Sequence, residues 1–243
     1  MPSPTSNPPN DGHERRAAQV QAMFGSIAHR YDLLNSLMSV CMHHRWRAAL
    51  VRGLRLRPGM RVLDVCAGTG DVAFAAGRSE PGLQAVVGCD FCIDMLEIAT
   101  AKQAAHSCAV TWVAADALAL PFRSATFDAC AVAFGIRNVI RPADGFAEMA
   151  RVTRPGGVVG CLEFGTPRGR FAAALVRMYE NMALPALGGL LSRRAAYTYL
   201  PESIGRFSSR EDVMEMMRAS GLAEVRVTDL ALGAVNLFTG VRR

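Results

Sequence analysis

Apolar and polar positions along the chain alternate in blocks that predict strands and helices in turn. Short apolar runs of strand length occur near residues 61–66, 85–90, 110–114, 128–134 and 157–164. Between them, apolar residues recur at helical spacing near 70–79, 93–105 and 142–153. This alternation predicts an α/β fold with a mostly parallel, doubly wound sheet, which binds ligands at the carboxyl ends of its strands.

The two ends of the chain depart from this alternation. Residues 1–13 are rich in Pro, Ser and Asn, and we expect a disordered tail there, followed by helices over about 14–58. Near the other end, a helix at about 209–220 precedes two strands near 223–230 and 234–241. These strands predict an antiparallel hairpin that closes the sheet, and we expect a single domain over 14–243.

The segment 166–207 interrupts the strand–helix alternation. It is rich in Leu, Met and Tyr and is punctuated by arginines. Its simplest interpretation is a helical cover inserted over the site. In the alternative interpretation it forms, together with the N-terminal helices, an apolar tunnel for a greasy substrate, and its arginines face lipid headgroups.

Composition narrows the class of protein. The 243 residues are 51% hydrophobic and 20% charged, which suits one compact α/β core. The formal charge of +6 comes almost entirely from arginine, since Lys102 is the only lysine. No dense basic tract with interleaved aromatics favours nucleic acid, and no apolar run approaches the roughly 18 residues of a membrane span.

Cysteine usage indicates a reducing compartment. The seven cysteines are an odd number, most lie inside predicted strands, and no signal peptide precedes them. We therefore expect a cytoplasmic protein without disulfides. Cys89 and Cys92 form a C-x-x-C pair, but no second pair or histidine cluster completes a zinc site, so no metal is predicted.

The first candidate for chemistry is the segment 62–71, where a strand-length apolar run ends in a glycine-bracketed turn before a helix. Gly68 and Gly70 allow backbone angles closed to other residues and let a ligand lie against bare main chain. Asp90 ends the next apolar run, where a carboxylate can bind both hydroxyls of a ribose. The pattern predicts a nucleoside-binding strand–loop–helix–strand unit.

Two cofactors fit this unit. Residues 68–73 satisfy the loose dinucleotide pattern G-x-G-x-x-A, which would place a pyrophosphate at the start of the following helix. Asp71 occupies that first turn and would repel a pyrophosphate. S-adenosylmethionine carries a sulfonium and an ammonium instead, and Asp64, Asp71, Asp90 and Asp116 would give it an acidic rim. The sequence favours the methyl donor, with NAD as the alternative.

Several separated motifs resemble one family, the C-methyltransferases of ubiquinone and menaquinone biosynthesis. The generic ones are the cofactor turn, GCDF at 88–91, and DALALPF at 116–122 followed by TFD at 126–128. The more specific ones are FGSIAHRYDLLN at 24–35, FGIRNV at 134–139, LEF at 162–164 and YTYLPESI at 197–204. The resemblance covers nearly everything after the N-terminal tail.

The resemblance implies the fold of the class I S-adenosylmethionine-dependent methyltransferases, with a seven-stranded, mostly parallel sheet. It implies that Thr69 and Asp90 bind the cofactor, Asp90 through its ribose, and that Asp116 and Ala117 hold the adenine side. Relatives often have Ser just before the FGIRN motif, where this chain has Ala133. The remaining predicted cofactor residues are Asp64, Gly68, Gly70 and Phe91.

The implied reaction is methyl transfer from S-adenosylmethionine to a ring carbon of demethylmenaquinol, giving menaquinol. The alternatives are the ubiquinone-pathway methylation of a 2-polyprenyl-6-methoxy-benzoquinol and another small-molecule methylation. The expected partner is a prenylated quinol, with at most peripheral contact with the inner face of the cell membrane. The sequence is compatible with a monomer and with a homo-oligomer.

Three residues are candidates for catalysis. Arg137 and Asn138 follow the fourth predicted strand, across from the cofactor turn. We hypothesise that Arg137 stabilises a phenolate, that Asn138 orients the ring and that Tyr31 completes the pocket. The alternative for Arg137 is a structural ion pair.

Three other functions are alternatives to the quinol methyltransferase, one of them an NAD-dependent oxidoreductase, which would bind a nicotinamide cofactor. An RNA or protein methyltransferase would typically carry an Asn/Asp-Pro-Pro-aromatic segment or an exposed cysteine where this chain has FGIRN. A module that binds the cofactor without catalysis would not need the intact acids or the intact Arg137–Asn138 pair.

Overall fold

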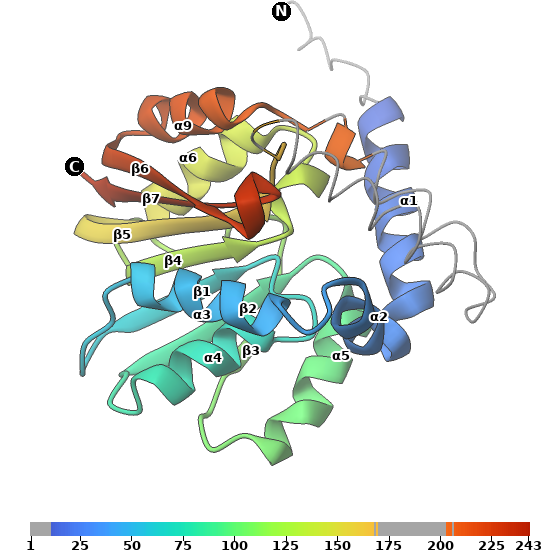
Figure 1. Ribbon diagram of the computed structural model, residues 1–243. Coiled ribbons are helices and arrows are strands. Elements are labelled where there is room, and N and C mark those ends of the chain that lie inside the picture. Colours follow the sequence, from blue (N-terminus) through green and yellow to red (C-terminus); the bar gives the residue numbers. More distant parts are fainter. Residues whose placement is uncertain (1–10, 168, 170–202, 206) are drawn as a thin grey trace, which may run out of the picture.

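One seven-stranded sheet organises the residues that the computed structural model describes, which are 11–167, 169, 203–205 and 207–243 (Figure 1). The strand order is β3-β2-β1-β4-β5-β7-β6. Every pairing is parallel except those of β7, which runs antiparallel to both β5 and β6. The strands are β1 (Arg61–Val65), β2 (Ala85–Asp90), β3 (Thr111–Ala114), β4 (Phe127–Ala133), β5 (Thr153–Phe164), β6 (Leu222–Leu230) and β7 (Val235–Arg242). The predicted fold class and C-terminal hairpin are confirmed.

Helices cover both faces of this sheet. On one face lie α3 (His43–Gly53) and α4 (Asp71–Ser79), and on the other lie α6 (Pro142–Val152) and α9 (Arg210–Ala219). Further along the sheet, α5 (Ile93–Lys102) packs on β2 and β3, and α1 (Asp11–Ile27) packs on α5. The remaining helical elements are α2 (Tyr31–Met38) and the short turns η1 (Ala28–Arg30), η2 (Gln103–Ala105), η3 (Ile136–Asn138) and η4 (Ala231–Gly233).

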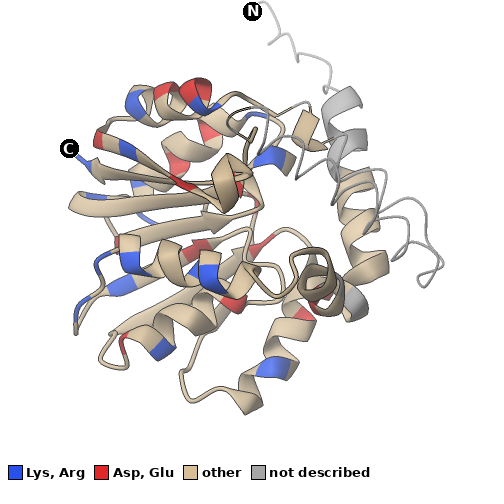
Figure 2. Cartoon of the chain, viewed as in Figure 1, with Lys and Arg blue, Asp and Glu red and all other residues tan. Residues whose placement is uncertain are grey.

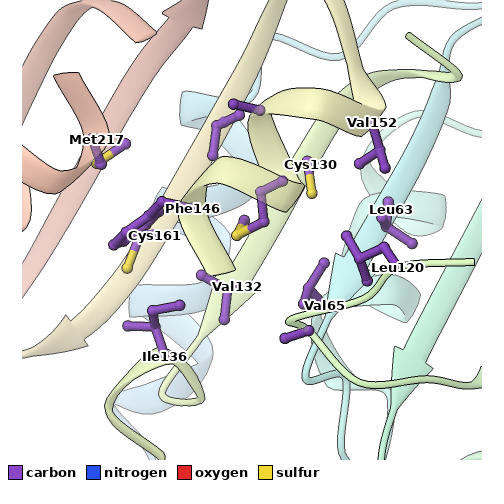
Figure 3. Packing of buried hydrophobic residues seen from close by; sticks show 14 of the residues in the cluster. Leu63, Val65, Leu120, Cys130, Val132, Ile136, Phe146, Val152, Cys161 and Met217 are labelled. Atoms are coloured by element: carbon purple, nitrogen blue, oxygen red, sulfur yellow. The ribbon is translucent and has the colours of Figure 1, made fainter. Parts of the chain in front are cut away.

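The larger core cluster lies between the sheet and the α6–α9 face. Side chains from β1, β4, β5 and α6 meet there around Phe146 and Cys161, and Met217 joins them from α9 (Figure 3). Phe146 and Met217 are fully buried, and burying each such side chain contributes about 1.5–3 kcal/mol. This packing fixes β1, β2 and β4 side by side, so that their carboxyl ends present one rigid edge to a ligand.

Three boundaries differ from the prediction. The first helix begins at Asp11, inside the predicted tail, and residues 1–10 lie outside the described part of the chain. The strand predicted from residue 157 begins already at Thr153, with an irregular register opposite Phe127 and Ala129. The expected cover at 166–207 falls almost entirely on residues 168, 170–202 and 206, outside the described part.

Among the described helices, none is both long enough and apolar enough to cross a bilayer.

Candidate functional site

A pocket opens where β1, β2 and β4 end, at the edge of the sheet where folds of this kind bind their ligands. Eight of the twelve residues predicted from the sequence line it. They are Tyr31, Gly68, Asp90, Phe91, Asp116, Ala117, Ala133 and Asn138. The other four, Asp64, Thr69, Gly70 and Arg137, lie behind its wall.

The turn after β1 depends on its glycines. Gly68 has φ +54, and a Cβ built on it would meet no atom within 4 Å, so its bare backbone faces open space. Gly70 has φ +87 and lies directly against the indole of Trp112. Gly88, on β2, contacts the other side of the same indole. Gly68 therefore serves the pocket, whereas Gly70 and Gly88 make room for Trp112.

Asp90 is placed to bind a ligand from the end of β2. Its Oδ2 accepts the Gly68 N–H at 2.8 Å and its Oδ1 accepts the Cys92 N–H at 2.9 Å. Burial raises the pKa of Asp90, and these backbone N–H groups partly oppose that rise. The Phe91 N–H also hydrogen-bonds this carboxylate, and of its roughly four lone-pair sites at least one stays available to the pocket. Asp116 is exposed on the adjoining wall, where its Oδ1 accepts the Leu118 N–H at 2.9 Å.

Asp64 lies beneath the turn. It is buried in β1 and its Oδ2 accepts the Ala73 N–H at 3.0 Å, at the start of α4. Burial raises the pKa of Asp64 to about 8. The contact stabilises the beginning of α4, so Asp64 supports the turn and does not belong to the expected acidic rim.

An ion-pair network ties the N-terminal helices to the turn and to α5. Lys102 Nζ lies 2.7 Å from Asp32 Oδ2 and 2.7 Å from Asp71 Oδ1. Asp71 Oδ2 also pairs with Arg47 at 2.7 Å. The Thr69 hydroxyl donates to Asp32 Oδ1 at 2.6 Å. The network therefore joins α2, α3, the start of α4 and the end of α5.

The charges in this network explain the protonation state of Asp71. Burial alone would raise its pKa, but the cations Arg47 and Lys102 outweigh that effect and lower it. Asp71 is therefore ionised and already paired. Because both of its oxygens face cations of the network, Asp71 is not part of the pocket's acidic wall.

Behind the pocket, Arg137 is paired with a buried acid. Its guanidinium NH1 lies 2.8 Å from Glu163 Oε1 and donates to the Phe134 carbonyl. The Arg137 side chain is only 6% exposed and Glu163 is fully buried. The Arg137 backbone N–H donates to Glu163 Oε2 at 3.3 Å. The structural ion pair that was the alternative role for Arg137 is therefore present. It fixes the turn that places Asn138 in the pocket wall.

The N-terminal helices supply another part of the wall, where Phe24 and Tyr31 pack against Cys92 and Met95. Tyr31 lines the pocket from the start of α2, next to Val20 and Phe24 of α1. Its ring meets Phe24 edge to face, with centroids 6.0 Å apart. Burial raises the pKa of Tyr31, and the charge of Arg47 partly opposes this. The Tyr31 hydroxyl is therefore neutral at ordinary pH and can donate a hydrogen bond.

The thiol nearest the site is not activated. Cys66 lines the pocket, where burial raises the pKa of its thiol well above the usual value. Burial likewise raises the pKa of Cys130. Neither thiol is a thiolate at neutral pH, which is unfavourable for a cysteine nucleophile.

The pocket fits a cationic nucleoside better than a dinucleotide. Its lining in the described chain includes two carboxylates, Asp90 and Asp116, and neither a lysine nor an arginine. A diphosphate would need positive charge or free helix N–H groups, whereas at the start of α4 the Ala73 N–H already donates to Asp64 Oδ2. A sulfonium and an ammonium match two acids, and the bare backbone of Gly68 leaves space for the ligand.

The strand order, the single antiparallel strand and this pocket define a class I S-adenosylmethionine-dependent methyltransferase. Solved structures agree on the fold. The [4+2]-cyclase SpnF matches with TM-score 0.66 and 18% identity, covering 91% of this chain and 95% of that chain. A methyltransferase of Thermotoga maritima matches with TM-score 0.63 and 18% identity, covering 92% and 99%. Because a cyclase shares the fold, the fold alone does not determine the reaction.

Sequence comparisons narrow the class. The model of the ubiE/COQ5 methyltransferase family matches residues 12–242, and the chain belongs to this family. A Geobacter sulfurreducens protein named ubiquinone/menaquinone biosynthesis C-methyltransferase UbiE is 40% identical, covering 93% of this chain and 89% of its own. The demethylmenaquinone methyltransferase of Deinococcus radiodurans is 40% identical, covering 98% of both. The chain is thus an S-adenosylmethionine-dependent C-methyltransferase, as its motifs predicted.

Sequence reasoning missed the ion-pair network and Glu163. Lys102 is the single lysine of the chain and lies near the end of a predicted helix. This position was a signal that could have indicated its acidic partners. Glu163 interrupts an otherwise apolar strand. Because charged residues are rarely buried unless they are paired, an acid in such a run predicts a buried cationic partner. Arg137 could have been named as that partner.

Proposed function

We propose that this protein transfers a methyl group from S-adenosylmethionine to a ring carbon of demethylmenaquinol, giving menaquinol. Family membership supports quinol methylation, and a relative named demethylmenaquinone methyltransferase matches over nearly the whole of both chains. Methylation of the ubiquinone-pathway benzoquinol is the second candidate, because other relatives carry the joint ubiquinone/menaquinone name.

The observation that carries the proposal is the mixed chemistry of the pocket lining. The lining holds the carboxylates Asp90 and Asp116 and the bare backbone of Gly68. It also holds the polar groups of Tyr31 and Asn138 among the apolar residues Phe24, Val139 and Ile140. The acids suit a cationic nucleoside. The apolar residues, with polar groups between them, suit a flat apolar ring that carries hydroxyls at its edge.

In the proposed reaction the cofactor would supply an electrophilic methyl group on its sulfonium. Asp90 would accept hydrogen bonds from the ribose hydroxyls, and Asp116 would hold the adenine side. The neutral Tyr31 hydroxyl donates to a quinol oxygen, and the Asn138 amide orients the ring. As that oxygen loses its proton to water, the donated hydrogen bond stabilises the developing negative charge. The ring carbon bonds the methyl as the methyl–sulfur bond breaks and leaves S-adenosylhomocysteine. The hydrogen on that carbon then leaves to water as a proton, and the oxygen regains a proton, so that one proton is released overall.

Arg137 has a positioning role in this proposal. Its guanidinium is held by Glu163, and its charge acts on Tyr31, where it favours the ionised hydroxyl. Direct contact between Arg137 and the substrate stays a prediction. The pair holds the turn 134–138, and this turn sets the position of Asn138.

We also propose where the protein works. A quinol with a prenyl tail resides in a bilayer, so the enzyme would meet it from the cytoplasm through peripheral contact with the inner face of the membrane. We further propose that residues 14–243 form one domain and that residues 166–207 form its cover. A homo-oligomer is compatible with this proposal.

The proposal is tested by incubating the protein with methyl-labelled S-adenosylmethionine and each demethylated quinol under reducing conditions. We expect label in menaquinol. Label only in the benzoquinol, or only in RNA, would refute the assignment. Asp90→Asn should weaken cofactor binding at least tenfold, since it removes a charged acceptor worth about 1.5–3 kcal/mol. Asp144→Asn, in an exposed pair with Arg141, is the matched control.

A further inference from the structure

Exposed apolar side chains are concentrated beside the pocket. Within the described ranges, six large apolar residues are exposed, and four of these lie between residues 33 and 42. We call these four the α2-turn surface: Leu33, Leu37, Val40 and Met42. Leu33 is 55% exposed and Val40 is 69% exposed. A cluster of this kind on a single helix and turn is typical of a contact surface.

The helix α2 has two faces with different tasks. Tyr31 lines the pocket, and Asn35, four residues later, hydrogen-bonds its side chain. Leu33 and Leu37 share the same four-residue spacing, displaced by two positions, which places them on the opposite side of the helix. One side of α2 therefore builds the pocket and the other presents apolar side chains outward.

The turn that follows α2 is ordered and strained. The Cys41 N–H donates to Ser36 O and the Met42 N–H to Ser39 O, both at 2.8 Å. Val40 has φ 47, in a region where β-branched residues are rare. Asn or Gly would adopt it at lower cost. A strained Val that is mostly exposed gains nothing from the protein's own core, and such outliers indicate function.

The part of the chain that follows this surface is basic. From Leu33 to Leu63 it has six arginines and no acidic residue, although one of these, Arg47, is buried and paired with Asp71. His44 and Arg45 are exposed immediately after the turn. Figure 2 shows basic positions in blue along α3, the helix that follows the turn. The nearest acid before it, Asp32, is already neutralised by Lys102. Apolar side chains rimmed by cations match the boundary between acyl chains and anionic headgroups.

We propose that the α2-turn surface inserts into the headgroup region of an anionic bilayer and so brings the pocket to the membrane. This inference rests on the proposed function for its purpose, because a bilayer is where a prenylated quinol resides. The partner is the lipid surface itself. Val40 and Leu33 enter the apolar boundary, while Arg45 and His44 face lipid phosphates.

The test is flotation of the full-length protein with vesicles that contain no quinol, so that it is independent of the reaction. One set is phosphatidylcholine mixed with phosphatidylglycerol, and the other is phosphatidylcholine alone. Val40→Asn relieves the strained backbone while removing the apolar side chain, so it should fold. Leu232→Asn is the matched control, because Leu232 is 57% exposed with φ 59 but lies in η4. Leu33→Gln is a second variant.

We expect wild type to float with the anionic vesicles, and high salt to release part of it. Val40→Asn and Leu33→Gln should each bind the anionic vesicles about tenfold less than wild type does. Leu232→Asn should bind them to the same extent as wild type. Turnover of a water-soluble, short-chain quinol should be unchanged in all three. Wild type that ignores anionic vesicles, or equal losses in Val40→Asn and Leu232→Asn, would overturn the proposal. So would a dimer that only Val40→Asn dissociates, because the surface would then bind a second copy.

If the protein floats but methylates neither quinol, the lipid surface stands and the proposed substrate fails. If it methylates a short-chain quinol but never floats, the proposed substrate stands and the lipid surface fails. The two proposals are thus separated by one pair of assays.

Discussion

Replacing Glu163 with Gln should destabilise the fold more than any other neutralisation of a single acid near the site. Glu163 is fully buried, and its two oxygens accept from three donors: the Arg137 guanidinium at 2.8 Å, the Phe164 N–H at 2.9 Å and the Arg137 N–H at 3.3 Å. Gln keeps the shape of the side chain but turns one oxygen into an amide donor. Whichever way the amide is placed, at least one donor faces another donor.

The magnitude follows from two terms. An orphaned buried donor costs about 1–3 kcal/mol, and Arg137, only 6% exposed, loses its counter-charge. Breaking a buried pair by removing one partner typically costs about 3–5 kcal/mol in total. Replacing both partners, as in Arg137→Met with Glu163→Leu, removes the uncompensated charge. This double variant should therefore recover a large part of the lost stability.

Urea unfolding followed by circular dichroism measures the free energy of unfolding for each variant. Glu148→Gln is the matched control, because Glu148 also pairs with an arginine, Arg151, at 2.6 Å, but in a partly exposed position. We expect it to cost no more than about 1 kcal/mol. A Glu163→Gln protein within about 0.5 kcal/mol of wild type, the range of ordinary surface substitutions, would refute the reasoning. So would a double variant less stable than Glu163→Gln.

Three further predictions concern the turn, the network and the buried acid. Gly68→Ala and Gly59→Ala both add a Cβ at positive φ in open space, so each should cost about 1–2 kcal/mol of stability. Calorimetry should show weaker cofactor binding only for Gly68→Ala. Equal affinities of the two variants for the cofactor would contradict the assignment of Gly68 to the pocket. Lys102→Met should raise the KM for S-adenosylmethionine severalfold, because Asp32 and Asp71 lose their shared cation. Lys102→Arg keeps the cation and should have a KM close to that of wild type. An unchanged KM in Lys102→Met would count against a role of the network in cofactor binding. Because the folded pKa of Asp64 is raised to about 8, the folded state binds the extra proton, and this group's contribution to stability is lost as pH rises from about 4 to 8. The fall in melting temperature between pH 6.5 and 8 should therefore be smaller in Asp64→Asn than in wild type, and parallel curves would show that this carboxyl does not titrate there.

The sheet could be predicted because each strand and helix is encoded in contiguous residues. The runs ending at Val65, Asp90 and Ala133 are apolar over a strand's length, and the parallel order brings their ends together. Where backbone geometry competes with pattern, the prediction was less exact. The strand beginning at Thr153 includes Pro155, Gly156 and Gly157 near its start. The pattern assigns such a composition to a loop, yet this part of the chain pairs, irregularly, with β4.

The site was predictable only in part, because side-chain direction depends on contacts distant in sequence. Asp90 and Asn138 follow strands and reach the pocket as expected. Thr69 instead turns to Asp32, 37 positions away, and Arg137 turns inward to Glu163, 26 positions away. No local spacing relates these partners. Asp64 in β1 and Asp90 at the end of β2 looked equivalent in sequence, although Asp64 supports the turn and Asp90 lines the pocket.

The indole that fills the gap between Gly70 and Gly88 also makes the molecule its own optical sensor. The ring nitrogen of Trp112 is buried without a hydrogen-bond partner in the described chain, so its emission should lie toward the blue. Because the ring touches the loop that carries Gly68, occupancy of that loop should change its brightness or colour. With Trp46, the other tryptophan, replaced by Phe, cofactor titrations would need neither a label nor a coupled assay.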